Sequence, residues 1–141
     1  MSEHDIQRRL EILRANLERL AEIPQATFEE FSADFRNLDS ALHRLQTSIQ
    51  ALLDIAAVLA SRLGLPAPRT SIDILSNLEE SGHLPEGSSA KFRPILGFRN
   101  RVVHLYDRID EQIVYRILTE ERGDLAELLE LFLEALERLD G

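Results

Sequence analysis

The amino-acid sequence predicts an all-α protein, an antiparallel helical bundle with one very long second helix. Apolar residues recur at steps of three and four along most of the chain, which is the spacing of one helix face. Runs of β-branched and aromatic residues, which are typical of strands, are missing. Only 5 prolines and 6 glycines interrupt the 141 residues, of which 44% are hydrophobic. We expect such a chain to form one compact domain, residues 1–141.

The first two predicted helices have the most regular apolar patterns. Residues 4–22 carry one apolar stripe, and Pro24 ends that helix. A Thr-x-x-Glu capping-box pattern at residues 27–30 marks the next start. Over residues 28–63 the steps of three and four continue without a slip, which predicts one helix of about 36 residues, roughly 54 Å long. We expect its stripe to face neighbouring helices rather than a cofactor, and Gly64 to cap its C-terminus.

The rest of the chain predicts shorter helices. They are a helix from Thr70 or Ser71 to about Glu80, a loop over 81–89, a helix from about Ser88 through Tyr106, a helix over 111–118 and a last helix over 125–139. Pro94 predicts a kink or a restart in the helix that reaches Tyr106, because proline cannot donate to the helix ladder. Asp110 is expected to cap the helix that follows it. Gly123 and Asp124 are expected to interrupt the chain before the last helix.

Composition excludes several classes of protein. The chain has no cysteine, so disulfides and thiolate metal sites are excluded. The N-terminal residues do not have the pattern of a signal peptide, and no apolar run approaches the ~20 residues of a membrane span. We therefore expect a soluble cytoplasmic protein. Its formal net charge of −9 argues against unspecific binding to nucleic acid or to a membrane surface, although a local basic site remains compatible with it.

Positive charge is concentrated in one short segment. Residues 91–108 carry five basic side chains and one acidic side chain, a net charge of +4, which leaves −13 for the rest of the chain. Such a concentration is typical of an anion-binding site. The alternative is structural, namely that these cations pair with carboxylates elsewhere in the bundle.

A helical projection separates this segment into two faces, at about 100° per residue. The face expected to be buried consists of Phe98, Val102, Leu105 and Ile109. The arc expected to point away from the core consists of Arg99, Asn100, His104 and Tyr106. Arg101 projects between the two and is expected to form an ion pair. The surrounding cations are expected to lower the pKa of His104 and to favour its neutral form.

These side chains have the chemistry that RNA cleavage requires. RNA carries its own nucleophile, the 2′-hydroxyl beside each phosphate. A histidine can deprotonate that hydroxyl or protonate the leaving oxygen, and an arginine can hold the phosphate through two hydrogen bonds. A tyrosine can orient the phosphate or stack on a base. No metal is needed, and a symmetric dimer would bring two histidines together.

The segment also resembles a known family. It matches the R-x4-H-x-Y motif of the HepT-like toxins, a branch of the HEPN superfamily, with Arg99, His104 and Tyr106 at the three motif positions. Asn100, directly after the arginine, also fits the HEPN pattern. The stretches "RLQTSIQALLDIAAVLA", "GLPAPRTSIDILSNLEESGHLP", "GFRNRVVHLYDRID" and "VYRIL" are similar to successive blocks of that family. Together the resemblance covers roughly residues 35–139. It departs from the family at Pro94, where a kink could alter how two sites meet.

The resemblance implies a fold, an activity and a partner. The fold would be an all-α HEPN bundle that forms a homodimer, and the activity that of a metal-independent ribonuclease toxin without a cofactor, acting on mRNA or tRNA. Arg99 and His104 would be catalytic, with Asn100, Arg101 and Arg108 supporting RNA binding. An MntA-like nucleotidyltransferase antitoxin would silence the toxin by transferring AMP from ATP to Tyr106, where bulk and negative charge would exclude the RNA phosphate.

Two other interpretations remain open at this point. The chain could be a catalytically weak HEPN module that docks to a nucleotidyltransferase and presents Tyr106 as its substrate. It could also be a helical scaffold whose arginines are only structural. The remaining histidines, His4, His43 and His83, are not spaced as metal ligands with His104.

Overall fold

The computed structural model describes residues 3–104 and 108–140 and has the predicted all-α architecture. The helices are α1 (Glu3–Glu22), α2 (Phe28–Ser32), α3 (Phe35–Arg62), α4 (Asp73–Glu80), α5 (Ser88–Leu96), α6 (Phe98–Val102), α7 (Glu111–Arg116) and α8 (Arg122–Asp140). A π-helical segment, Ile117–Glu121, joins α7 to α8. Two short strands, β1 (Val103–His104) and β2 (Arg108–Ile109), lie between α6 and α7. None of the helices in the described ranges is long and apolar enough to cross a membrane.

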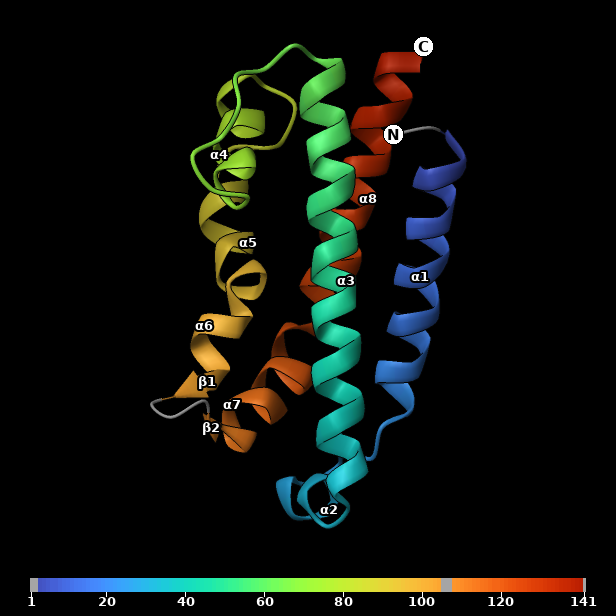
Figure 1. Ribbon diagram of the computed structural model, residues 1–141, viewed down its shortest axis with the longest axis vertical. Coiled ribbons are helices and arrows are strands. Elements are labelled where there is room, and N and C mark those ends of the chain that lie inside the picture. The colour runs from blue at the N-terminus through green and yellow to red at the C-terminus, as the bar shows by residue number, and fades with distance from the viewer. Residues whose placement is uncertain (1–2, 105–107, 141) are drawn as a thin grey trace.

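Helix α3 is the centre of the bundle (Figure 1). It contacts α1 and α8, and also the shorter helices α2, α4 and α7. Its stripe supplies fully buried side chains, among them Leu45, Leu52, Ile55 and Leu59. The α5–α6 arm runs beside α3 and carries the two strands near the end where α3 begins, far from the chain termini (Figure 1).

The predicted second helix is interrupted near its start, so the expectation of one unbroken helix over 28–63 was wrong. Thr27 caps α2 as expected, because its side chain accepts a bond from the Glu30 N–H. The chain then leaves the helical path at Ala33 and Asp34. Asp34 adopts an extended conformation and accepts a 2.9 Å bond from the Arg36 N–H, which caps α3 separately. Phe35, predicted to lie in the apolar stripe, is consequently 73% exposed.

The C-terminus of α3 ends at the predicted glycine. Gly64 has a φ of 69°, a left-handed conformation that favours glycine. Its N–H donates to the Ser61 carbonyl, and the Leu65 N–H donates to the Ala60 carbonyl. These two bonds form a Schellman motif, which satisfies carbonyls that the helix end would otherwise leave unpaired.

Helix α4 begins without the cap that the sequence predicted. Neither Thr70 nor Ser71 is its N-cap, because a turn over these residues leads to Ile72, which has helical angles and no side-chain cap bond. The acidic end of α4 instead caps its neighbour. Glu79 accepts bonds from the N–H groups of Gly87 (3.1 Å) and Ser89 (2.7 Å), which lowers the pKa of its carboxyl group and fixes the start of α5.

The break expected at Gly123 and Asp124 does not occur. Helix α7 continues through the π-helical segment into α8, and Gly123 lies inside α8. A glycine in a helix costs about 1 kcal/mol relative to alanine. Burial of Leu118 and Leu125, both fully buried on either side of Gly123, offsets that cost and keeps the helix continuous.

The two glycines allow a matched test of the fold. We expect Gly64→Ala to lower the free energy of unfolding by roughly 1–2 kcal/mol, because alanine is strained at a left-handed φ although the space around it is open. Gly123→Ala is expected to raise it by about 0.5–1 kcal/mol, since Gly123 is helical and a methyl group there meets no neighbour within 4 Å. Urea unfolding followed by circular dichroism measures both. Equal effects of the two substitutions would contradict the left-handed conformation of Gly64 or the helical conformation of Gly123.

Candidate active site

The candidate site lies on the chain between α5 and α7. Helix α5 passes through Pro94 and ends at Leu96, so the restart that the sequence predicted at Pro94 occurs instead at Gly97. Helix α6 is only five residues long, and two of its side chains hold it against the bundle. Phe98 is 3% exposed and Val102 is 1% exposed, one turn apart on the same face. Arg99, between them in sequence, is exposed, as predicted.

The segment does not remain helical through Tyr106, which is the main correction to the sequence prediction. β1 pairs with β2 in antiparallel fashion, with Val103 opposite Ile109 and His104 opposite Arg108. The Asp110 N–H donates a 2.7 Å bond to the Val102 carbonyl. In a continuing helix, the Val102 carbonyl would accept a bond from the N–H four residues later. Because the Asp110 N–H occupies this carbonyl instead, α6 ends at Val102. Ile109, expected to be buried, is therefore 38% exposed.

The residues of the matched motif are distributed over two elements rather than one helix. Arg99 and Asn100 lie on the exposed side of α6, as expected. The backbone of His104 lies in β1, directly after α6. The side chain of His104, and Leu105 and Tyr106 as a whole, are outside the described residues. Arg108 lies on β2 and is exposed.

Asp110 fixes the path of the chain from β2 into α7. Besides closing the ladder through its N–H, its carboxylate accepts a 3.1 Å bond from the Ile113 N–H and caps α7, as the sequence predicted. The pairing of Asp110 with Val102 was not predicted, because bonds between residues eight apart leave no periodic signal. The two roles of Asp110 place the start of α7 beside the end of α6.

The basic side chains of residues 91–108 fall into two groups. Three are held by carboxylates: Lys91 lies 2.7 Å from Glu127, Arg93 lies 3.6 Å from Asp73, and Arg101 lies 2.6 Å from Glu121. For these three the structural interpretation of the charge is confirmed. Within the described ranges, neither Arg99 nor Arg108 forms an ion pair or a side-chain hydrogen bond. Within this segment, the positive charge open to a ligand therefore comes from Arg99, on α6 before β1, and from Arg108, on β2.

Arg101 forms the ion pair that the helical projection led us to expect. Its two terminal nitrogens donate to the two carboxylate oxygens of Glu121 at 2.7 and 2.6 Å, and this pairing raises the pKa of Arg101. One of the nitrogens also donates 3.1 Å to the Pro94 carbonyl. Sequence reasoning missed Glu121, because its contact with Arg101 joins residues twenty apart.

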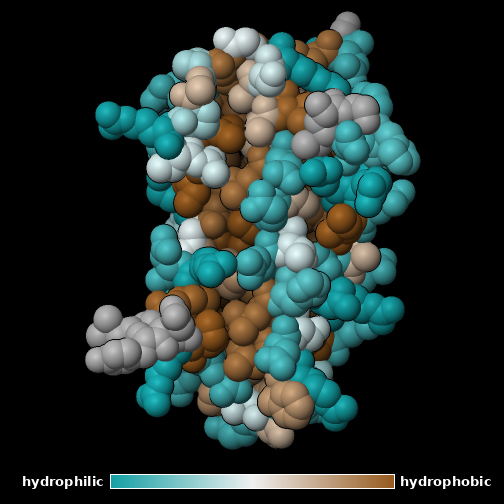
Figure 2. All heavy atoms as spheres, in the orientation of Figure 1, coloured by the Kyte–Doolittle hydropathy of each residue, from teal (hydrophilic) through white to brown (hydrophobic). Residues whose placement is uncertain are grey.

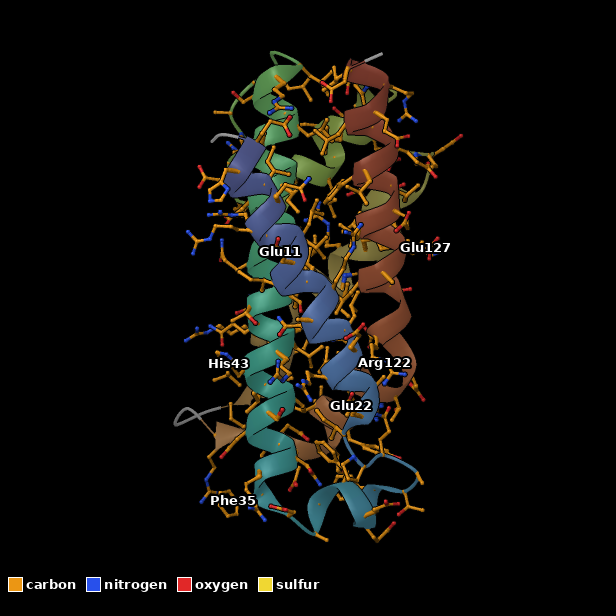
Figure 3. The ribbon with its side chains drawn as sticks, turned by 90° about the vertical axis from the view of Figure 1, so that its right-hand side faces the viewer. Glu11, Glu22, Phe35, His43, Arg122 and Glu127 are labelled. Carbon is orange, nitrogen blue, oxygen red and sulfur yellow. The ribbon has the colours of Figure 1, made fainter. Side chains whose placement is uncertain are left out.

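An apolar band accompanies the site on the same face of the bundle. Figure 2 shows it running along the molecule between hydrophilic margins, toward the end of the bundle that carries the two strands. Phe35 and His43, from α3, project toward the side where the strands lie (Figure 3). Among the described residues, no group of three His, Asp or Glu side chains is arranged to hold a metal ion.

Known proteins similar to this chain indicate its family. The profile of the family described as Ribonuclease HepT-like matches residues 13–132. A protein of Archaeoglobus fulgidus, named for a proposed RNase activity, is 31% identical over 139 residues, which are 95% of this chain and 97% of that protein. The mRNA nuclease HepT of Shewanella oneidensis is 26% identical over 102 residues, 72% of this chain and 77% of that one.

A solved structure has the same fold. It is the tri-AMPylated HEPN toxin of Shewanella oneidensis in complex with an MNT antitoxin, and it superposes with a TM-score of 0.80 at 22% sequence identity. The likeness covers 95% of this chain and 99% of that chain. With a family profile that spans most of its length, the chain belongs to the HepT-like ribonuclease family.

Proposed function

We propose that this protein is the toxin of a toxin–antitoxin pair, a metal-independent ribonuclease of the cytoplasm in which Arg99 and His104 act on RNA. The observation that carries the proposal is the cation at Arg99, which has no ion-pair partner among the described residues. It is exposed on α6, its neighbours Lys91, Arg93 and Arg101 are held by carboxylates, and the histidine of the motif follows on β1. The named activity of the Shewanella oneidensis relative supports an RNA substrate, either mRNA or tRNA.

The proposed reaction uses the nucleophile that RNA itself supplies. The 2′-oxygen attacks the adjacent phosphorus, the bond between phosphorus and the 5′-oxygen breaks, and the products are a 2′,3′-cyclic phosphate and a 5′-hydroxyl. A proton leaves the 2′-hydroxyl and another reaches the 5′-oxygen, and His104 serves one of these transfers. The guanidinium of Arg99 holds the phosphate and offsets the charge that develops on it.

Asn100 and Arg108 are proposed to support RNA binding around this centre. Both are exposed, and Arg108 lies opposite His104 across the ladder. A phosphate held near Arg99 would therefore have a second cation on β2 within the same small region. Exposed cations of this kind raise affinity through counterion release rather than through sequence readout.

A second copy of the chain is proposed to complete the site. The single histidine of the motif in each chain is too few to act as both base and acid, whereas a twofold axis supplies a second one. The apolar band of Figure 2 and the 73% exposed ring of Phe35 support a homodimer on the face that carries the strands. Residues 1–141 would form one domain in each copy.

The proposed control is adenylylation of Tyr106 by an MntA-like nucleotidyltransferase antitoxin. Tyr106 lies in sequence between the two strands, two residues after His104. An added AMP brings bulk and a negative phosphodiester to the place where RNA phosphate would bind, so it blocks by volume and by charge repulsion. The solved HEPN toxin that carries AMP groups beside an MNT antitoxin supports this mode of control.

Cleavage of RNA in the presence of EDTA tests the nuclease proposal. We expect the purified wild type to cleave RNA, and Arg99→Ala and His104→Ala each to lose about 100-fold or more. Because Arg99 is exposed and has no described ion-pair partner, Arg99→Ala should change the free energy of unfolding by no more than about 0.5 kcal/mol.

Arg19→Ala is the matched control, since Arg19 is an exposed arginine of α1 that pairs with exposed Glu22. It should leave cleavage unchanged. A wild type that is inactive on RNA, yet binds the antitoxin, would instead favour the catalytically weak docking module. A large loss of stability in Arg99→Ala would favour the structural scaffold.

Intact-mass spectrometry tests the proposed regulation. The chain is co-expressed with an MntA-like nucleotidyltransferase and compared with a Tyr106→Phe variant. We expect mass increments of whole AMP groups on the wild type and none at position 106 of the variant, because phenylalanine lacks the accepting hydroxyl. AMP located only on other residues would contradict the assignment of Tyr106.

A further inference from the structure

Helix α6 is too short to hold its own orientation. It has five residues, whereas isolated helices below about 12–15 residues are marginal in water. Its direction is therefore set by contacts with the bundle. Phe98 and Val102 supply the apolar contacts, and they restrain one face only. The Asp110–Val102 bond holds the end of α6, and a side-chain contact on another face would restrain its rotation.

The ion pair of Arg101 with Glu121 is that contact. The side chain of Arg101 is 32% exposed and that of Glu121 is 19% exposed, so water screens the pair only in part. Both Arg101 terminal nitrogens are used on one carboxylate, and one of them also donates to the Pro94 carbonyl. A single guanidinium thus ties α6 to the last turn of α5 and to the chain that enters α8.

Glu121 reaches Arg101 from an unusual backbone. It is the last residue of the π-helical segment Ile117–Glu121. A π-helical turn is wider than an α-helical turn, which changes the direction in which the following side chains point, and such turns are frequent at functional sites. The segment departs from regular α-helical geometry, and in this conformation its last side chain, Glu121, forms the bidentate pair with Arg101.

We propose that Arg101 is a positioning residue, which through Glu121 holds α6 so that Arg99 and the start of β1 keep their geometry toward the RNA phosphate. This inference rests on the proposed ribonuclease function. It replaces the RNA-binding role that the sequence led us to expect for Arg101, because a guanidinium already engaged by a carboxylate and a carbonyl has few donors left for a phosphate. Arg99 lies two residues before Arg101 and His104 three residues after it.

The test compares both partners of the pair in the full-length protein. The variants are Arg101→Gln, Glu121→Gln, the double substitution, the charge swap Arg101→Glu with Glu121→Arg, and the milder Arg101→Lys. Glu127→Gln is the control, because Glu127 lies on α8 six residues after Glu121 and pairs with a cation of α5. Cleavage of an RNA oligonucleotide is measured as kcat and KM at two salt concentrations.

A positioning role predicts matching losses from either side of the pair. Each single substitution should lower kcat about 10-fold or more while KM changes less than about twofold, since misplacement by about 1 Å can cost 100-fold. The double substitution should be no worse than either single one, because both remove the same contact. Arg101→Lys should be intermediate, as lysine keeps the charge without the fork, and the charge swap should recover part of kcat.

Direct RNA binding by Arg101 would give a different pattern and overturn the proposal. Arg101→Gln would then raise KM and reduce the salt dependence by about one charge. Glu121→Gln would leave kcat unchanged or lower KM, because it releases the arginine for the RNA. Loss of activity in Glu127→Gln equal to that in Glu121→Gln would also contradict a specific role for this pair.

Amide hydrogen exchange separates this inference from the proposed function. If the wild type does not cleave RNA, the ribonuclease proposal fails, and exchange of the amides of residues 98–104 still decides whether the pair orders α6. Faster exchange there in Arg101→Gln and Glu121→Gln, but not in Glu127→Gln, would support the positioning role. Unchanged exchange in all three variants would overturn it.

Discussion

The backbone N–H of Asp110 donates to the carbonyl of Val102 over 2.7 Å, and this bond sets where α6 ends. It occupies the acceptor that a longer helix would need, so the chain turns into the β1–β2 ladder. Because the Asp110 carboxylate also caps α7, one residue fixes both the departure and the return of the segment. The consequence is a compact corner in which Arg99 comes from a helix and His104 from a strand.

The charges around this corner are divided between two tasks. An acidic bundle readily supplies carboxylates for basic side chains, and Lys91, Arg93 and Arg101 each have one. These pairs join α5 to α4 and α8, and α6 to the π-helical segment, so they stabilise the packing of the helices. Of the basic residues in segment 91–108, Arg99 and Arg108 have no such partner in the described ranges; Arg99 lies on α6 just before β1, and Arg108 lies on β2. A net charge of −9 therefore does not prevent a local cationic site.

Features controlled by neighbouring residues were predicted from the sequence. Thr27, Gly64 and Asp110 cap their helices as expected, because a cap depends on side chains within three or four residues. The motif residues Arg99 and Asn100 were placed correctly on an exposed face for the same reason, since a helical projection holds over the single turn that α6 contains.

Features that depend on competing local signals or on partners distant in sequence were not predicted. Asp34 caps α3 separately even though the apolar steps run across it, so a polar cap prevailed over hydrophobic periodicity. The strands depend on pairing between residues six and four apart in sequence, and this pairing overrode the helical pattern of the segment. Gly123 stays helical because buried leucines on both sides outweigh its low propensity. Glu121 could be recognised only once the fold brought it to Arg101.

The chemistry of the cleaved ends tests the central claim most directly, namely that the guanidinium of Arg99 and the neighbouring histidine act on the nucleophile of RNA itself. An oligonucleotide cut by the purified protein in EDTA is analysed by mass spectrometry, beside a copy with a single 2′-deoxy sugar at the cut position. The account predicts a 2′,3′-cyclic phosphate and a 5′-hydroxyl from the first, and no cut at that position in the second. A 5′-phosphate with a 3′-hydroxyl, or equal cleavage of the deoxy copy, would contradict it.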